Sequence, residues 1–251
     1  MCDALQNFLN FQGRWDERLA LNKKAEVRAV AATDYDSAGW RAFQLGYIQF
    51  LRRQTDAVLA CANRAAAHWV TAKAGAREHA IAIHLRGLGY ELKGDGPAAI
   101  AAYQETLDLH RAHAAESVDV AIALNTLADA ERRSGDYDAA EAHVREALRL
   151  ARTSDSKSGI ATYSCNLVEL ALNREDWSAA ETLAREALPL AESVHRQELI
   201  ADGNHRLAKA LVRQGKASEA LPYARRAVEI YTHLDHPNLA KAQAILAECS
   251  G

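Results

Sequence analysis

A fourteen-residue segment occurs twice in this chain, forty residues apart. Residues 135–148 read G-D-Y-D-A-A-E-A-H-V-R-E-A-L, and residues 175–188 read E-D-W-S-A-A-E-T-L-A-R-E-A-L. Eight positions are identical, and in the first copy they are Asp136, Ala139, Ala140, Glu141, Arg145, Glu146, Ala147 and Leu148. Because repetition at a fixed period of about 20–50 residues is typical of solenoids and related arrays, this feature constrains the fold more than composition does.

The same register extends in both directions from Gly135, at spacings of 40 or 41 residues. The positions equivalent to Gly135 are Gly13, Arg53, Gly94, Glu175 and Gly215. Each precedes a short turn and then a helix rich in alanine. Gly adopts positive φ readily after a helix end, and Asp caps the next helix. The Gly-Asp pairs at 94–95 and 135–136 therefore predict tight turns between paired helices.

We predict an all-α fold, a right-handed α-solenoid of helix-turn-helix repeats of about 40 residues. We expect one solenoid over residues 1–251, with a half unit 1–34, full units 35–75, 76–116, 117–156, 157–196 and 197–235, and a capping helix 236–251. The expected helices cover residues 3–12, 15–31, 37–52, 55–72, 77–92, 97–114, 118–133, 137–152, 158–173, 177–193, 197–214, 217–234 and 237–249.

Small residues occur where the paired helices must touch. In the second helix of one unit, Ala140, Val144 and Ala147 have the spacing i, i+4, i+7 and share a face. The equivalent sets are Ala99, Tyr103 and Thr106; Ala180, Ala184 and Ala187; and Ala220, Ala224 and Ala227. The first helices carry large-small pairs, among them Leu45-Gly46, Leu127-Ala128 and Leu207-Ala208. A bulky residue at these alanines should overpack the contact, at a cost of roughly 1–3 kcal/mol.

At these residues the chain resembles tetratricopeptide repeat (TPR) proteins, whose signature is a pattern of large, small and aromatic residues across a helical pair. The residues that match this pattern are Ile83, Gly87, Tyr90, Ala99 and Tyr103, and then Leu127, Ala128, Tyr137, Ala140 and Ala147. The units are longer than the standard length of about 34 residues. The extra residues fall at the end of the second helix and in the following loop. Long units of this type are familiar from kinesin light chains and from the C-terminal sensor regions of bacterial STAND-type NTPases.

Four segments resemble those STAND sensor regions: residues 11–21, 119–136, 175–192 and 196–200. The resemblance implies a module that follows a nucleotide-binding domain, so an NTPase domain in cis is one expected partner. The phosphate-binding motif G-x-x-x-x-G-K-[ST] does not occur in the sequence. Because Met1 falls inside the first helix of a unit, we expect a fragment of a larger protein or a lone sensor.

Charge and hydropathy exclude several classes of function. The formal net charge is −3 with both signs mixed throughout, so we expect no nucleic-acid partner. No apolar run approaches the roughly 18 residues that span a bilayer, and the N-terminus does not resemble a signal peptide. The four widely separated cysteines are typical of reduced thiols. We therefore predict a cytoplasmic protein with no membrane contact.

The histidine pairs and acidic pairs in the sequence give little support for metal binding or catalysis. His110 with His113, and His233 with His236, lack the third and fourth ligands that a zinc site needs. Acidic pairs such as Glu175-Asp176 fall in turns, where they cap helices. We find no motif that pairs a nucleophile with a base. The expectation is no metal, no cofactor and no enzyme activity.

A binding groove is the remaining candidate, lined by the face of each first helix opposite its packing pair. The predicted groove residues are Phe43, Tyr47, His84, Asn125, Asp129, Arg132, Asn166, Glu169, Asn173, His205, Arg206 and Lys209, with Phe50 and Leu88 on the same stripe. Aromatic side chains would anchor an extended peptide, and amides would hold its backbone. Because Asn is a poor helix-interior residue, Asn125 and Asn166 in mid-helix need a reason. The alternative is that the aromatic residues belong to the core and the polar residues are only solvated.

The sequence thus favours a non-catalytic scaffold that binds a protein or peptide in a concave groove. The resemblance implies that it is the sensor or interaction arm of a signalling or regulatory protein. The alternative is a small-ligand receptor, or an enzyme, built on the same solenoid.

Overall fold

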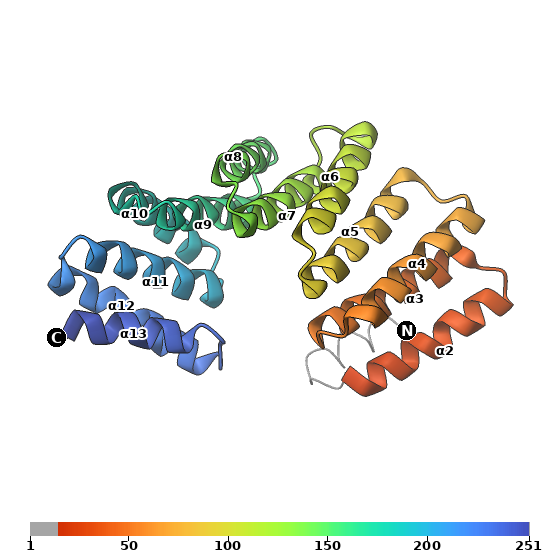
Figure 1. Cartoon of the computed structure of the whole chain (residues 1–251), viewed down its shortest axis with the longest axis horizontal. Coiled ribbons are helices and arrows are strands. Elements are labelled where there is room, and N and C mark those ends of the chain that lie inside the picture. Colours follow the sequence, from red (N-terminus) through yellow and green to blue (C-terminus); the bar gives the residue numbers. More distant parts are fainter. Residues whose placement is uncertain (1–14, 251) are drawn as a thin grey trace. The chain divides into compact units, whose positions relative to one another are not determined.

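The computed structural model describes residues 15–250, and this part of the chain is helical, with twelve helices and no strand (Figure 1). The helices are α2 (Trp15–Ala31), α3 (Tyr35–Leu51), α4 (Thr55–Ala72), α5 (Ala76–Lys93), α6 (Gly96–His113), α7 (Val118–Ser134), α8 (Tyr137–Thr153), α9 (Lys157–Asn173), α10 (Trp177–Ser193), α11 (Gln197–Arg213), α12 (Ala217–His233) and α13 (Leu239–Ser250). Their ends agree with the sequence predictions to within two residues, and the fold is an all-α repeat solenoid. The helix expected at 3–12 lies outside the described residues.

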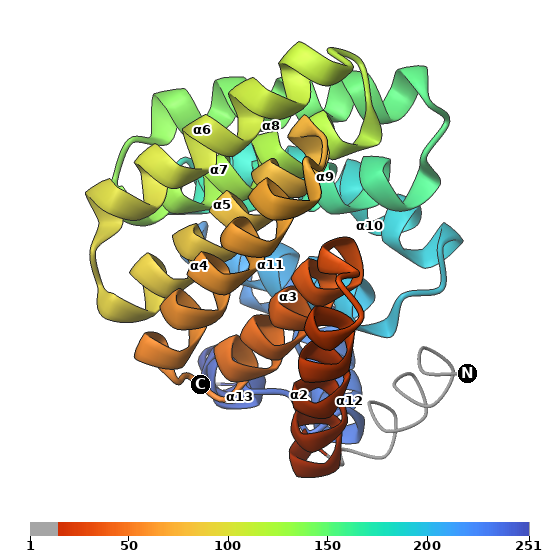
Figure 2. The ribbon, with the colours of Figure 1, turned by 90° about the vertical axis from the view of Figure 1, so that its right-hand side faces the viewer.

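The chain forms two compact units, one up to Ala123 and one from Leu124 onward. From α2 to α6 in the first unit, and from α8 to α13 in the second, each helix packs against the next, and Figure 2 shows α2 and α3 side by side. Helices two apart also touch: α3 with α5 in the first unit, and α11 with both α9 and α13 in the second. The first helices of successive pairs therefore lie side by side within a unit. The division of the chain into one half unit, five units and a cap stays a prediction.

The turn inside each helical pair uses a left-handed residue at the repeated marker position. Its φ is 56° at Arg53, 78° at Gly94, 91° at Gly135, 58° at Glu175 and 75° at Gly215. Three of the following helices have an aspartate N-cap: Asp95, Asp136 and Asp176 accept hydrogen bonds from the backbone N–H three residues on, at 3.2, 3.1 and 3.0 Å. The predicted register and turn chemistry are confirmed.

The small residues predicted at the helix contacts form the core of each pair. All twelve predicted positions on α6, α8, α10 and α12 are at most 2% exposed. The first helix of a pair also lies close to the second: a methyl group added at Gly87 of α5 would lie 2.5 Å from the Tyr103 ring of α6. Because these contacts leave no room, helix positions are set by buried small residues, and the outer faces are free to vary.

The two units differ in the residues that fill their cores. In the first unit the Trp69 ring is fully buried and packs edge-on against Trp40 at 5.4 Å. The second unit instead buries a continuous cluster of alanine, leucine and isoleucine that includes Ala184, Leu207 and Ile230. Among the described helices, none is both long and apolar enough to cross a bilayer.

Candidate functional site

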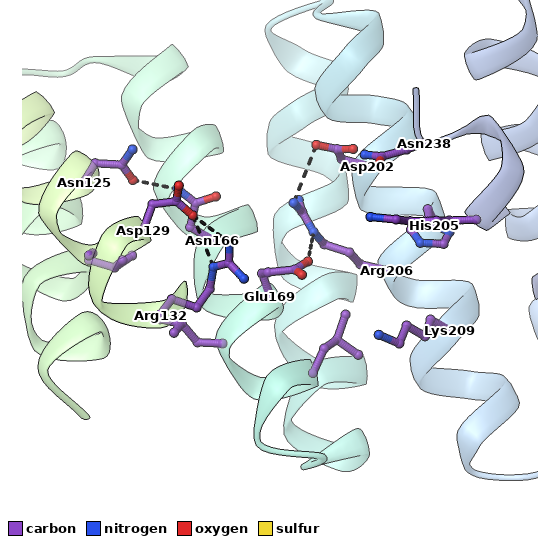
Figure 3. A pocket seen from close by; sticks show the side chains of 15 residues that line it. Asn125, Asp129, Arg132, Asn166, Glu169, Asp202, His205, Arg206, Lys209 and Asn238 are labelled. Atoms are coloured by element: carbon purple, nitrogen blue, oxygen red, sulfur yellow. Dashed lines mark hydrogen bonds and ion pairs between the residues drawn. The ribbon is translucent and has the colours of Figure 1, made fainter. Parts of the chain in front are cut away.

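The second unit contains a cavity of about 430 Å³ bordered by the first helices of its pairs and by α13 (Figure 3). Its lining is Asn125, Ala128, Asp129, Arg132, Val144, Asn166, Glu169, Leu170, Leu172, Asp202, His205, Arg206, Lys209, Asn238 and Lys241. Most of these side chains come from α7, α9 and α11, since those helices turn the faces opposite their packing pairs toward one space. The cavity is therefore strongly polar.

Eight of the twelve predicted groove residues line this cavity: Asn125, Asp129, Arg132, Asn166, Glu169, His205, Arg206 and Lys209. Asn173 does not, because its side chain donates to the Glu169 backbone carbonyl at 2.6 Å within α9. Tyr47, Phe43 and His84 belong to the first unit and are described below. The assignment of these residues to a partner stays a prediction.

Two amide side chains pair across α7 and α9. Asn166 Nδ2 donates to Asn125 Oδ1 at 2.6 Å. The remaining Nδ2 of Asn125 and Oδ1 of Asn166 make no hydrogen bond with the described residues. Exchanging oxygen and nitrogen in both amides reverses the bond but again leaves one donor and one acceptor. The pair is fixed in place and can still bind a polar group of each kind.

Arg206 lies between two carboxylates at the centre of the cavity. Its Nε donates to Glu169 Oε2 at 2.7 Å, and its Nη2 lies 3.6 Å from Asp202 Oδ2. The Tyr231 hydroxyl donates to the other oxygen of Asp202. Burial alone would lower the pKa of Arg206, but the charges of Asp202 and Glu169 outweigh burial and raise it. Burial likewise raises the pKa of Glu169, and Arg206 more than reverses that shift.

The third carboxylate is also neutralised. Asp129 accepts from Arg132 Nη2 at 2.7 Å and from Arg133 Nη2 at 2.9 Å. In contrast, Lys209 and Lys241 make no hydrogen bond or ion pair with any described residue. Figure 3 shows Lys209 extending from α11 toward the α9 side of the cavity. Three carboxylates and four cations line the cavity, so the lining has one cation in excess. Glu169 and Asp202 share Arg206, and the charge of Lys209 also acts on Glu169.

His205 is a neutral group in this charged lining. Burial, and then the positive charge of Arg206, lower the pKa of its imidazole to about 4. The ring faces Tyr231 edge-on at 6.4 Å, and Nδ1 is buried without a hydrogen-bond partner among the described residues. At neutral pH the imidazole therefore adds no charge beside Lys209.

Sequence reasoning missed three polar lining residues: Asp202, Asn238 and Lys241. Asp202 lies three residues before His205, so extending the predicted stripe by one helical turn would have found it. Asn238 directly precedes the C-terminal helix α13 and Lys241 lies in its first turn, and we interpreted this helix only as a cap. The repeat pattern could not predict these two residues, because the C-terminal helix is not followed by a second helix and so is not part of a complete repeat.

The first unit has a smaller cavity, of about 150 Å³, with a different lining. It is bordered by Phe43, Ile81, His84, Thr106, His110, Asp119, Ile122 and Ala123. Burial, and then the charge of His110, lower the pKa of His84 to about 4. Asp119 is paired with Arg77 at 3.0 Å. This cavity is mainly apolar and offers no unpaired charge among its described residues.

The predicted aromatic residues of α3 form a row beside this cavity. Tyr47 stacks on Phe43 with ring centroids 6.4 Å apart, and its ring is tilted against that of Phe50 at 6.3 Å. Tyr47 is 44% exposed, and neither phenylalanine is fully buried. Tyr47 is therefore a surface residue, whereas Phe43 packs partly buried against the core cluster around Trp69. Phe43 and His84 line the cavity, whereas Tyr47 does not.

Within the described part of the chain, no three His, Cys, Asp or Glu side chains converge as metal ligands. The described lining of the second-unit cavity includes no hydroxyl or thiol side chain. Its chemistry is that of charged groups, amides and one neutral imidazole. These groups can bind and orient a polar ligand.

Comparisons with known proteins agree with the repeat pattern. Models of the tetratricopeptide repeat family match residues 78–153 and residues 205–234. A search of the curated proteins finds no match.

Three solved structures have a similar fold. BtubC (BKLC) from P. vanneervenii is 18% identical, with a TM-score of 0.77, over 89% of this chain and 94% of its own. A STAND signal-transduction ATPase with a tetratricopeptide repeat sensor, from Pyrococcus horikoshii, is 12% identical, with a TM-score of 0.79, over 98% of this chain but 37% of its own. A Rap protein in complex with Competence and Sporulation Factor is 13% identical, with a TM-score of 0.69, over 98% of this chain and 72% of its own.

Proposed function

We propose that this chain, a tetratricopeptide repeat protein resembling the sensor region of a STAND protein, is a non-catalytic scaffold that binds an extended polypeptide in its second unit. One observation carries the proposal: the Asn125–Asn166 pair at the cavity, fixed at 2.6 Å, with a spare donor and a spare acceptor.

A peptide backbone presents one N–H and one C=O per residue, and both lose water when a peptide enters a cavity. An amide pair with one free donor and one free acceptor replaces that water whichever way the amides are oriented. Asn has a helix propensity below that of most residues, so two mid-helix asparagines cost helix stability. Hydrogen bonding to the backbone of a bound peptide is a reason for an asparagine at both positions.

The relatives support this proposal at the level of fold. One similar structure is the sensor of a signal-transduction ATPase, and another is a Rap protein complexed with Competence and Sporulation Factor. We therefore propose that the chain is the sensor or interaction arm of a regulatory protein. An NTPase domain in cis and a cytoplasmic location belong to the same proposal.

A small-ligand receptor is the second candidate. A volume of about 430 Å³ falls in the range of small-molecule pockets, roughly 300–1,000 Å³, and charged groups converge on it. The lining offers no hydroxyl or thiol nucleophile among its described residues, which disfavours an enzyme that works by covalent catalysis.

Phage display of random dodecapeptides on the immobilised chain tests the polypeptide proposal. We expect enrichment on the wild type and its loss on the double variant Asn125→Ala with Asn166→Ala. Asn173→Ala is the matched control, because it removes the same side chain outside the cavity and should leave capture intact.

Thermal melting of the three proteins separates binding from folding. Equal melting temperatures with capture lost only in the double variant support the amide pair. Retained capture by the double variant overturns it. If no peptide is enriched and small organic acids raise the melting temperature, the receptor alternative replaces the polypeptide scaffold.

A further inference from the structure

The cavity of the first unit contains two imidazoles whose polar atoms the fold does not use. His84 of α5 and His110 of α6 both border this cavity of about 150 Å³. Neither ring makes a hydrogen bond or an ion pair with a described residue. A polar group that loses water without gaining a partner is costly, so a ligand that supplies the partner is favoured.

Both imidazoles are neutral at neutral pH, and the charges near them are paired. Burial, and then the charge of His110, lower the pKa of His84 to about 4. Burial also lowers the pKa of His110, and the charges of Arg77 and His113 act in the same direction, against that of Asp119. Asp119 is bound to Arg77 at 3.0 Å. The described lining thus has no charge left for a charged ligand, and it favours a neutral one.

The rest of the lining is mainly apolar and comes from three helices. Phe43 of α3, Ile81 of α5, and Ile122 and Ala123 of α7 border the cavity. Phe43 and Ile81 also pack against the core cluster that contains Trp69, so this wall is held in place. Ile122 is 51% exposed and lies toward solvent. An apolar cavity of about 150 Å³ takes up a benzene-sized ring, whereas drug-sized ligands need roughly 300–1,000 Å³.

We propose that the first-unit cavity binds a neutral phenol-type ring, whose hydroxyl hydrogen-bonds to His84 and His110 while the ring packs against Phe43. A neutral imidazole has one N–H donor and one acceptor nitrogen, and a phenol hydroxyl both donates and accepts. Thr106 does not compete for this role, because its hydroxyl donates to the Ala102 carbonyl at 2.9 Å. The ring comes either as a free molecule or as the side chain of a tyrosine in a peptide, with the same chemistry.

This site belongs to the first unit and shares no lining residue with the second-unit cavity. The inference therefore goes beyond the polypeptide proposal. Each one stands or falls by its own experiment.

Four one-ring probes of similar size test the class of ligand: p-cresol, toluene, benzoate and benzylamine. Saturation-transfer NMR with the full chain at about pH 7.5, where both imidazoles and p-cresol are neutral, gives the affinity of p-cresol. Displacement of p-cresol gives the affinities of the others, so benzoate bound at the charged second-unit cavity is not counted.

We expect p-cresol to bind about fivefold more tightly than toluene, because the hydroxyl adds a hydrogen bond of ordinary strength. Benzoate and benzylamine should bind roughly tenfold more weakly than p-cresol, because their charges lose water without gaining a partner. Equal affinities of p-cresol and toluene overturn the role of the hydroxyl. Tightest binding of either charged probe overturns the neutral ligand.

The two imidazoles are tested by the double variant His84→Leu with His110→Leu. It removes both hydrogen-bonding side chains and keeps the cavity apolar, so the preference for p-cresol over toluene should disappear while toluene still binds. His233→Leu, at an exposed position of the second unit, is the matched control and should keep the preference. If the double variant does not fold, His84→Gln and His110→Gln replace it, and a preference unchanged in both overturns the assignment.

The position of the ring is tested at the exposed edge of the cavity. Ile122→Trp places an indole beside the opening and should reduce the affinity for both p-cresol and toluene roughly tenfold. Val118→Trp is the matched control, because Val118 is 54% exposed on the same helix and does not border the cavity. Equal affinities in the two variants overturn this location.

Two N-acetylated and C-terminally amidated octapeptide pools separate the sources of the ring, one with a fixed Tyr and the other with a fixed Phe. Greater capture of the Tyr pool, reversed by p-cresol, identifies a tyrosine side chain. Equal capture of the pools, with p-cresol still preferred over toluene, identifies a free phenol. If neither p-cresol nor the Tyr pool binds, the phenol site is overturned, and peptide capture through Asn125 and Asn166 remains a separate question.

Discussion

The two units place different chemistry at the same positions of the repeat. Ten residues before the left-handed turn residue, the first unit has Phe43 and His84 and the second has Asn125, Cys165 and His205, so that only histidine is common to both. Six residues before it, the first unit has Tyr47 and Leu88, and the second has Asp129, Glu169 and Lys209. The cavities found in the first and second units are about 150 and 430 Å³. One backbone scaffold thus supports an apolar cavity and a charged one.

The residues that stabilise the fold are therefore different from the residues that determine the chemistry of each cavity. The alanines at the helix contacts are buried in both units, so packing does not distinguish them. The distinction lies on the opposite face of each first helix, where a substitution changes the cavity without changing the helix contact. Experiments that exchange residues between the two units therefore test this separation.

The largest effect is expected at Arg206. Nine residues before the turn, Arg206 occupies the place of the fully buried Leu85 in the first unit. Arg206→Leu imports the first unit's residue but leaves Glu169 and Asp202 without their cation. We expect a loss of roughly 3 kcal/mol in the free energy of unfolding, measured by urea denaturation, because breaking a partly buried ion pair strands the remaining charge.

Neutralising the two carboxylates supplies the control. Arg206→Leu combined with Glu169→Gln and Asp202→Asn should recover most of the lost stability, since no unpaired charge remains. If the triple variant is no more stable than Arg206→Leu alone, the charged network does not account for the difference between the units.

The next effect concerns the shared scaffold. Ala140→Leu should reduce the free energy of unfolding by roughly 1–3 kcal/mol, because Ala140 is fully buried at a helix contact. Ala142→Leu makes the same change two residues on, at an exposed position of α8, and should alter stability little. Similar losses in the two variants, measured by thermal melting, would show that the packing register is wrong.

The free energy of unfolding should decrease in acid, because each unit buries a neutral histidine. The pKa of His84 and of His205 is about 4 in the folded chain, below the usual value of 6.5. Because the unfolded chain binds these protons first, the stabilisation is complete above about pH 6.5 and is lost as pH falls toward 4.

Each histidine should contribute roughly 1–2 kcal/mol of this loss between pH 6.5 and pH 4.5. Urea denaturation at several pH values measures it, and His84→Asn or His205→Asn should flatten the pH dependence. If the pH dependence of the free energy of unfolding is unchanged in both variants, the buried neutral histidines do not cause the loss of stability in acid.

The sequence predicted the helices and most of the second-unit lining because both depend on the repeat. A fixed period sets which face of each first helix is opposite the packing pair, and Asn125, Glu169 and Lys209 follow from it. Asp202 was missed only because the stripe was ended one turn too early. Asn173 was included because periodicity does not reveal that a side chain near a helix end bonds to its own backbone.

Other features have no periodic signal. The contribution of Lys241 depends on where α13 packs after the last repeat, which the spacing of small residues does not determine. The aromatic row of α3 could be assigned to the core or to the surface from sequence, because an apolar side chain at a given spacing suits both. Only the packing of neighbouring helices decides its exposure.

The smallest effects are expected at the turns, where the two units should behave alike. Arg53 in the first unit and Glu175 in the second occupy the left-handed conformation, with φ of 56° and 58°, at positions where other repeats have Gly. A side chain there costs roughly 1 kcal/mol in backbone strain, and glycine removes that cost but gains entropy in the unfolded chain. Arg53→Gly and Glu175→Gly should therefore each change the free energy of unfolding by a few tenths of a kcal/mol, in the stabilising direction.

Gly135→Ala is the reverse change and should destabilise by about 1 kcal/mol. If the two glycine variants differ in sign, the turns contribute to the difference between the units, and the separation of scaffold from cavity does not extend to the loops.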